Sequence, residues 1–131
     1  MTFKVTKEWM ANTYLDINTK VFNLALPLVR LKVKKNLKIY ARFNKKGRNT
    51  RKGKFKKMKI WAYQQDDKIV MNKKFISEKM ARDVLAHEMV HVWQDCIKDK
   101  KYHGFSFKLW KYQLKNNDIK LAEFCDPNDY K

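Results

Sequence analysis

The spacing of apolar residues changes along the chain, and each spacing predicts a different kind of element. From Lys7 to Leu26, apolar side chains recur every three or four residues, as they do on one face of an α-helix. Thr6 precedes this segment as a candidate N-cap, and Pro27 follows it as a residue that cannot continue a helix. The pattern therefore predicts an amphipathic helix over residues 7–26.

The following segments alternate apolar and polar residues, which is the period of a half-buried β-strand. Two such segments, 38–43 and 58–63, flank a polar, glycine-containing connection from Asn44 to Lys54. This order predicts a β-hairpin with its tip in the polar connection. A third short strand is predicted from Lys68 to Asn72, after a turn at Asp66-Asp67.

Two further helices complete the predicted fold. Ser77 can cap a long helix that runs to about Lys98, and a last helix is expected from about Ser106 to Asn116. The order of helix, three strands and two helices predicts an α+β domain with a small three-stranded antiparallel sheet. With 131 residues, 44% of them apolar, and no repeat or linker, the chain is expected to form a single domain over residues 1–131.

The predicted helix 77–98 contains the motif His87-Glu88-Met89-Val90-His91. Residues four apart lie on one face of a helix, about 6 Å apart along its axis, so His87 and His91 can both bind one ion. Zinc prefers such nitrogen ligands, and catalytic zinc sites keep a position for water beside three protein ligands. Glu88 is placed to take a proton from that water as a general base and later pass it to a leaving amine.

An HExxH motif also arises by chance inside ordinary helices, so its surroundings matter. Two histidines and a glutamate inside an apolar helix need partners, because each unpaired buried polar group costs on the order of 1 to 3 kcal/mol. Zinc and its water would supply those partners. The apolar residues around the motif are Met80, Val84, Leu85, Ala86, Met89, Val90, Val92 and Trp93.

His103 is the expected third zinc ligand, because the chain holds only three histidines. The segment after His91 is long enough to end the helix and turn back, and Gly104 permits a tight backbone path. Glu123 and Asp95 are weaker candidates for this position, because imidazole is the better zinc ligand.

A longer zinc motif, HExxHxxGxxH, is excluded by the residues that follow the second histidine. That motif needs glycine at position 94 and histidine at position 97, but these positions hold Gln94 and Ile97.

The segments HEMVH at 87–91 and HGFSFK at 103–108 together resemble the SprT-like zinc metalloprotease domain, which includes the Spartan-type DNA-dependent proteases. The resemblance covers about residues 37–115 and implies a zincin-like fold. It makes His87, His91 and His103 the ligands of a Zn²⁺ cofactor, Glu88 the catalytic base and Phe107 a packing aromatic. Members are implicated in cleaving proteins attached to DNA, and many append a zinc ribbon, which this sequence lacks.

The charge of the chain points to an anionic partner. Lysine and arginine number 31 against 13 acidic residues, which gives a net charge of +18. Such a charge attracts polyanions, and nucleic acid is the leading candidate. Basic side chains are concentrated, without any acidic residue, in the predicted hairpin. The expected DNA contacts there are Arg42, Lys45, Lys46, Arg48, Arg51, Lys52, Lys54, Lys56 and Lys57.

Three aromatic residues lie beside this basic segment: Phe55, Trp61 and Tyr63. If they are exposed they can stack on unpaired bases, which would favour single-stranded or frayed DNA. The alternative is that they belong to the core and that the lysines form a solvated face.

The leading hypothesis is a zinc-dependent endopeptidase that is recruited by DNA to DNA-bound protein substrates. The rival is a DNA-binding protein with a structural zinc site and no proteolytic activity, in which Cys96, Cys125 or Asp126 supplies a fourth ligand. A third hypothesis is a protease whose positive charge serves only its solubility. Tyr102 is a candidate for stabilising the oxyanion.

The sequence also bears on location and assembly. No apolar run is long enough for a membrane span, so we expect a monomeric protein in the cytoplasm with no membrane partner. The small size and the lysine- and asparagine-rich composition would suit a phage-encoded member, in which case the location is the host cytoplasm or nucleoid. Cys96 and Cys125 form no CxxC pair and are expected to be buried free thiols.

Overall fold

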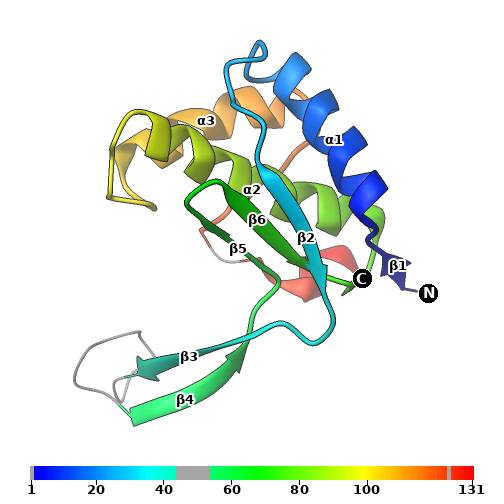
Figure 1. Cartoon of the computed structure of the whole chain (residues 1–131). Helices are drawn as coiled ribbons and strands as arrows, with labels where there is room; N and C mark the ends of the chain where they lie inside the picture. The colour runs from blue at the N-terminus through cyan, green and yellow to red at the C-terminus, as the bar shows by residue number, and fades with distance from the viewer. Residues whose placement is uncertain (1, 44–53, 124) are drawn as a thin grey trace.

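The computed structural model describes residues 2–43, 54–123 and 125–131, and for residues 38–43 and 54–59 it describes the backbone alone. Three α-helices, seven strands and one 3₁₀ helix occur in these ranges, so the fold is α+β as predicted (Figure 1). The elements are β1 (Phe3–Lys4), α1 (Lys7–Lys20), β2 (Arg30–Lys34), β3 (Lys38–Phe43), β4 (Lys54–Lys59), β5 (Ala62–Gln65), β6 (Lys68–Asn72), β7 (Lys74–Phe75), α2 (Glu78–Cys96), α3 (Phe105–Lys115) and η1 (Pro127–Tyr130).

The first helix begins where the sequence predicts but ends one and a half turns earlier. The Thr6 side chain accepts a hydrogen bond from the backbone N–H of Trp9, as an N-cap does. Helix α1 stops at Lys20 rather than Leu26, because the buried Asn18 amide binds both backbone groups of Leu26 at 3.1 Å. These bonds turn the chain back on itself before Pro27 is reached.

The three-stranded sheet differs from the predicted one in composition and direction. Its strand order is β2-β6-β5, with β2 parallel and β5 antiparallel to the central strand β6. The prediction of a wholly antiparallel sheet was wrong, because β2 was not foreseen. Arg30–Lys34 alternates in burial as a strand does, but its two apolar residues are too few to mark it clearly in the sequence.

The predicted hairpin exists as a separate unit. Strands β3 and β4 pair antiparallel with Lys38 opposite Lys59, and in Figure 1 they extend away from the three-stranded sheet. The predicted strand 58–63 is divided between β4 and β5. The division falls at Ile60 and Trp61, because the buried Asn72 donates to both of their backbone oxygens, from its side chain to Ile60 and from its backbone N–H to Trp61. The hairpin tip predicted between these strands lies largely outside the described residues.

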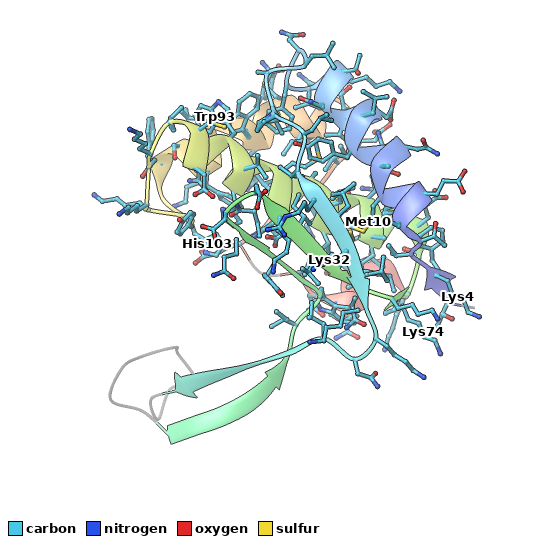
Figure 2. The ribbon with its side chains drawn as sticks, viewed as in Figure 1. Lys4, Met10, Lys32, Lys74, Trp93 and His103 are labelled. Atoms are coloured by element: carbon cyan, nitrogen blue, oxygen red, sulfur yellow. The ribbon has the colours of Figure 1, made fainter. Side chains whose placement is uncertain are left out.

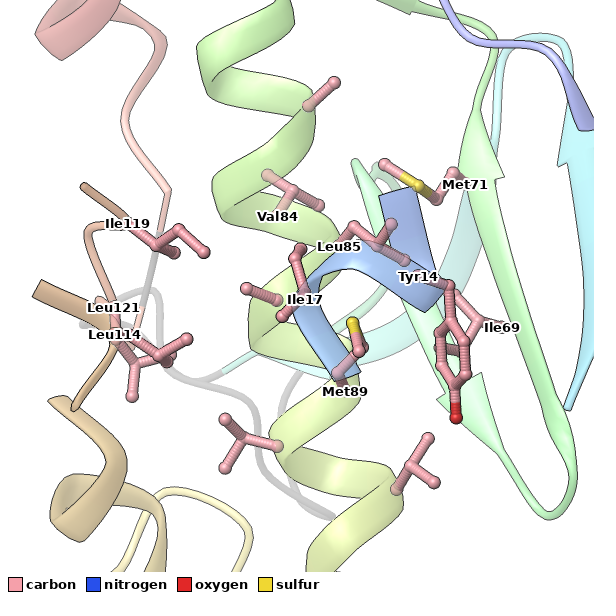
Figure 3. Close-up of a cluster of buried hydrophobic side chains, with 14 of the residues drawn as sticks. Tyr14, Ile17, Ile69, Met71, Val84, Leu85, Met89, Leu114, Ile119 and Leu121 are labelled. Carbon is pink, nitrogen blue, oxygen red and sulfur yellow. The ribbon is translucent and has the colours of Figure 1, made fainter. Parts of the chain in front are cut away.

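Helices α1 and α2 pack on the three-stranded sheet, and α3 packs on α2. Their shared core includes Tyr14 and Ile17 of α1, Leu85 and Met89 of α2, and Ile69 of β6 (Figure 3). Helix α2 is buried on most of its surface, as the apolar surroundings of the histidine motif predict. No helix in the described parts of the chain is long and apolar enough to cross a membrane.

Candidate metal centre

Three imidazoles meet at the C-terminal half of α2. His87 and His91 lie one turn apart on this helix, with their Nε2 atoms 3.0 Å apart. The loop after α2 returns so that His103 Nε2 lies 3.4 Å from His87 Nε2, and Figure 2 shows His103 on the side of the molecule away from Lys4. Candidate ligand atoms of all three residues lie within 4.8 Å of one another, so the group could hold a metal ion.

The spacing of these nitrogens fits a small divalent cation. Two ligands at zinc–nitrogen distances of 2.0–2.1 Å in a tetrahedron are separated by about 3.3 Å. The separations of 3.0 Å and 3.4 Å bracket this value. Zinc is therefore compatible with the site, although the geometry does not choose it over other cations with similar ligand distances.

The outer ring nitrogens of His87 and His91 fix where their protons lie. His87 Nδ1 is 2.8 Å from the backbone oxygen of Ala122, which can only accept, so Nδ1 donates. His91 Nδ1 is 2.7 Å from Oε1 of Gln94 and donates in the same way. Both Nε2 atoms then present lone pairs to each other, which is unfavourable unless a cation lies between them. The hydrogen bonding thus favours a metal ion at this point.

Gln94 connects the second histidine to the loop that carries the third. It is fully buried, and its Nε2 donates to the backbone oxygen of Lys101 at 3.2 Å and to Ser106 Oγ at 2.9 Å. Ser106 in turn donates to the Asp99 carboxylate. The Lys101 carbonyl can only accept a hydrogen bond, so the Gln94 Nε2 group must face it. The Gln94 Oε1 atom then faces His91 and accepts from its Nδ1–H. Gln94 was not predicted to support the site, although its position three residues after His91 places it on the same side of the helix.

Two residues near His103 hold the loop and the rings together. A Cβ atom on Gly104 would lie 3.0 Å from Lys101 Cβ and 3.1 Å from its backbone oxygen, so the tight turn favours glycine, as predicted. The buried Phe107 ring packs against all three imidazoles, with centroid distances of 4.9–5.4 Å. Its expected role as a packing residue is confirmed.

Glu88 lies beside the three imidazoles and has little contact with solvent. Only 7% of it is exposed, and its Oε1 lies 4.0 Å from His87 Nε2. Burial raises the pKa of Glu88 to about 8, whereas burial and then the neighbouring His91 lower the pKa of His87 to about 3. Burial also lowers the pKa values of His91 and His103, so all three imidazoles are neutral at pH 7, as metal binding requires.

A cavity of about 300 Å³ opens next to Glu88 and His87. Its walls come from the middle of α2, the segment leading into β5 and the C-terminal segment that includes η1. Trp61 forms part of the apolar wall and also packs on Phe75, with ring centroids 5.5 Å apart. Five acidic side chains line the cavity: Asp83, Glu88, Glu123, Asp126 and Asp129.

The other ligand candidates do not join the three histidines. Within residues 2–43, 54–123 and 125–131, the group of possible metal ligands contains no cysteine or carboxylate. Glu123 lies 3.7 Å from the Nδ1 atom of His103, and Asp95 instead accepts hydrogen bonds from Gln64 and Tyr102. The Tyr102 hydroxyl is therefore already engaged.

The cysteines differ from expectation in their exposure. Both are free thiols, but Cys96 is exposed and Cys125 is only partly buried. Cys96 is the last residue of α2, beyond the buried part of the helix. The prediction that both thiols are buried was wrong, because it treated the helix end as part of the core.

The predicted DNA contacts lie on or between the hairpin strands. Arg42 belongs to β3, and Lys54, Lys56 and Lys57 belong to β4, where the backbone alone is described. The remaining five, Lys45, Lys46, Arg48, Arg51 and Lys52, lie outside the described residues, as does the side chain of Phe55. Trp61 and Tyr63 are half-buried, and Lys68 Nζ lies 5.8 Å from the centre of the Tyr63 ring.

Two imidazoles and a buried glutamate on an HExxH helix, joined by a third imidazole from the following loop, are the features of a metalloprotease-like domain. The model of the SprT-like family matches residues 10–125, and the chain belongs to this family. The match includes most of α1 and the first part of the segment after α3, so it extends beyond residues 37–115 on both sides. No curated protein matches the sequence.

Proposed function

We propose that the protein is a zinc-dependent endopeptidase acting on proteins associated with DNA. The convergence of three imidazole Nε2 atoms beside the buried Glu88 carries this proposal, because it joins a cation site to a candidate base. His87, His91 and His103 would hold the zinc ion, which when bound supplies Lewis-acid polarisation of a carbonyl and a lower pKa for water.

Glu88 is the general base in this mechanism. Its carboxylate accepts a proton from the attacking water and returns it to the leaving nitrogen of the peptide. Burial alone favours the protonated form of Glu88, and a divalent cation nearby favours the ionised form that the base step needs. The cavity beside Glu88 offers room for the peptide, with Trp61 as its apolar wall.

DNA is recruited by the basic hairpin in this proposal. The segment from Arg42 to Lys59 has ten basic residues and no acidic one. Strands β3 and β4 carry part of this charge away from the three-stranded sheet (Figure 1). DNA held there raises the local concentration of proteins bound to the same DNA, so substrate choice would depend mainly on location.

The test compares cleavage of a DNA-bound protein with and without DNA and with and without chelator. Glu88→Gln removes the base while keeping the shape of the side chain, and Glu8→Gln is a matched change at an exposed glutamate on α1. We expect zinc- and DNA-dependent cleavage in the wild type and in Glu8→Gln, and none above background in Glu88→Gln. Cleavage that survives Glu88→Gln would refute the mechanism.

The recruitment step has its own control. Lys54→Gln, Lys56→Gln and Lys57→Gln together should reduce DNA stimulation without changing DNA-independent cleavage. If cleavage by the wild type does not depend on DNA or salt, the alternative hypothesis of a protease whose charge serves only solubility would be favoured. Absence of turnover in a protein that unfolds on metal removal would favour the structural-zinc alternative.

A further inference from the structure

Helix α3 carries an exposed apolar stripe that the metal centre does not use. Phe105 is 78% exposed, Leu109 54% and Tyr112 71%, and their spacing places them on one face of the helix. The opposite face holds the buried residues Phe107 and Leu114. Exposed apolar residues are ordinary when single, but a row of three large ones indicates an interaction surface.

The same helix is strongly cationic. It contains no acidic residue, and its three lysines, Lys108, Lys111 and Lys115, are all exposed. None of them forms an ion pair within the part of the chain that the structure describes. At 100° per residue, the three lysines lie along one flank of the apolar stripe. We call these six residues, Phe105, Lys108, Leu109, Lys111, Tyr112 and Lys115, the α3 outer face.

The combination of exposed apolar side chains with exposed lysines favours one class of binding partner over others. A second copy of the same face would bring lysines against lysines, which repel. Duplex DNA could pair its phosphates with the lysines but would leave the aromatic rings unused, because its bases are already stacked. A single strand uses both, since unpaired bases stack on aromatic rings while lysines neutralise phosphates.

We propose that the α3 outer face binds single-stranded nucleic acid, with bases stacked on Phe105 and Tyr112 and phosphates paired with Lys108, Lys111 and Lys115. The rings are about 10.5 Å apart along the helix axis, so they engage different bases of one strand. Phe105 follows His103 by two residues, which brings this strand close to the metal centre. The surface is distinct from the basic hairpin and does not depend on peptidase activity.

The test measures binding of a fluorescently labelled oligothymidylate by anisotropy over a range of salt concentrations, with a duplex of equal length alongside. Phe105→Ala with Tyr112→Ala should weaken single-strand binding by about 5-fold or more for each ring. Duplex binding and the salt dependence should change little. Leu15→Ala, at an apolar residue 58% exposed on α1, is the matched control and should bind as the wild type does.

Lys108→Gln, Lys111→Gln and Lys115→Gln together should lower the slope of log K against log salt by about 2 for single strands, at about 0.7 per phosphate. Lys4→Gln, Lys7→Gln and Lys74→Gln remove the same charge from exposed positions in β1, at the start of α1 and in β7, and should lower the slope less. Lys4 and Lys74 lie on the side of the molecule away from His103 (Figure 2).

Tyr112→Phe separates loss of stacking from loss of folding. It keeps the ring and should bind as the wild type does, and circular dichroism should show unchanged melting for every variant at these exposed positions. The proposal is overturned if the double alanine variant keeps single-strand affinity within twofold, or if single-strand and duplex affinity fall equally. It is also overturned if the alanine changes reduce binding to phosphatidylserine vesicles and not to the oligonucleotide.

Discussion

Replacing Gln94 with leucine tests whether the hydrogen bonds behind the histidines prepare the metal centre. The change keeps the size of the side chain but removes the acceptor for His91 Nδ1 and the donors to Lys101 and Ser106. Loss of such contacts behind a metal ligand typically costs 10- to 100-fold in metal affinity, or about 1.4–2.8 kcal/mol. A buried N–H left on His91 would also cost the metal-free protein about 1–3 kcal/mol of stability.

Zinc affinity is measured by competition with a chromophoric chelator, and stability by urea unfolding of the metal-free protein. ¹⁵N NMR of the histidine rings reports which nitrogen of His91 carries the proton. Gln113→Leu, at an exposed glutamine of α3, is the matched control and should leave all three measurements unchanged.

Gln94→Glu separates the two roles of the amide. The carboxylate still accepts from His91 Nδ1, so the ring should keep its proton there, but it cannot donate to the Lys101 carbonyl or to Ser106. We therefore expect the His91 signal to be retained while the metal-free protein is destabilised. If Gln94→Leu binds zinc within twofold of the wild type and leaves the His91 ring signal unchanged, the proposed role of Gln94 is refuted.

Three other predictions address the base, the packing of the rings and a surface carboxyl group. Glu88→Gln should keep zinc affinity within a few-fold and reduce turnover by about 10²- to 10⁴-fold, measured on the same zinc-loaded sample. Phe107→Ala should destabilise the protein by about 3–5 kcal/mol in urea unfolding, because a buried ring is lost beside all three imidazoles. Hydrogen bonds from Arg82 and then from Lys20 lower the pKa of Asp16. The Asp16 carboxylate therefore stabilises the fold above its unfolded pKa near 3.8, and this stabilisation is lost as the pH falls through the lower folded pKa. Asp16→Asn should therefore cost less than about 1 kcal/mol in urea unfolding at pH 7, and this cost should disappear as the pH falls through the lowered folded pKa of Asp16. A cost that stays the same at acidic pH would contradict the assignment.

The sequence predicted the helices well because each has a local signal. Thr6 and Ser77 both accept a backbone hydrogen bond at the start of a helix, as their positions before apolar periodic segments predict. The sheet was harder, because the parallel pairing of β2 with β6 joins segments more than thirty residues apart and leaves no local mark. The early end of α1 depends likewise on a contact between Asn18 and Leu26 that only the folded chain reveals.

The candidate ligands were predictable because their chemistry is rare in this sequence. The chain has three histidines, and all three meet. Their supporting acceptors were not predictable in the same way. A backbone oxygen such as that of Ala122 carries no residue signature, and Gln94 is recognisable only once its bonds to Lys101 and Ser106 are seen.

The segment after α3 also determines how short a working fragment can be. The oxygen of Ala122 orients His87, and the Tyr130 hydroxyl donates to the buried carboxylate of Asp83, one turn before that histidine on α2. A fragment trimmed to residues 37–115 would retain all three histidines but would lose the Ala122 oxygen that orients His87. A minimal fragment should therefore keep residues 116–131, since Ala122 and Tyr130 support the candidate metal centre without appearing in any motif.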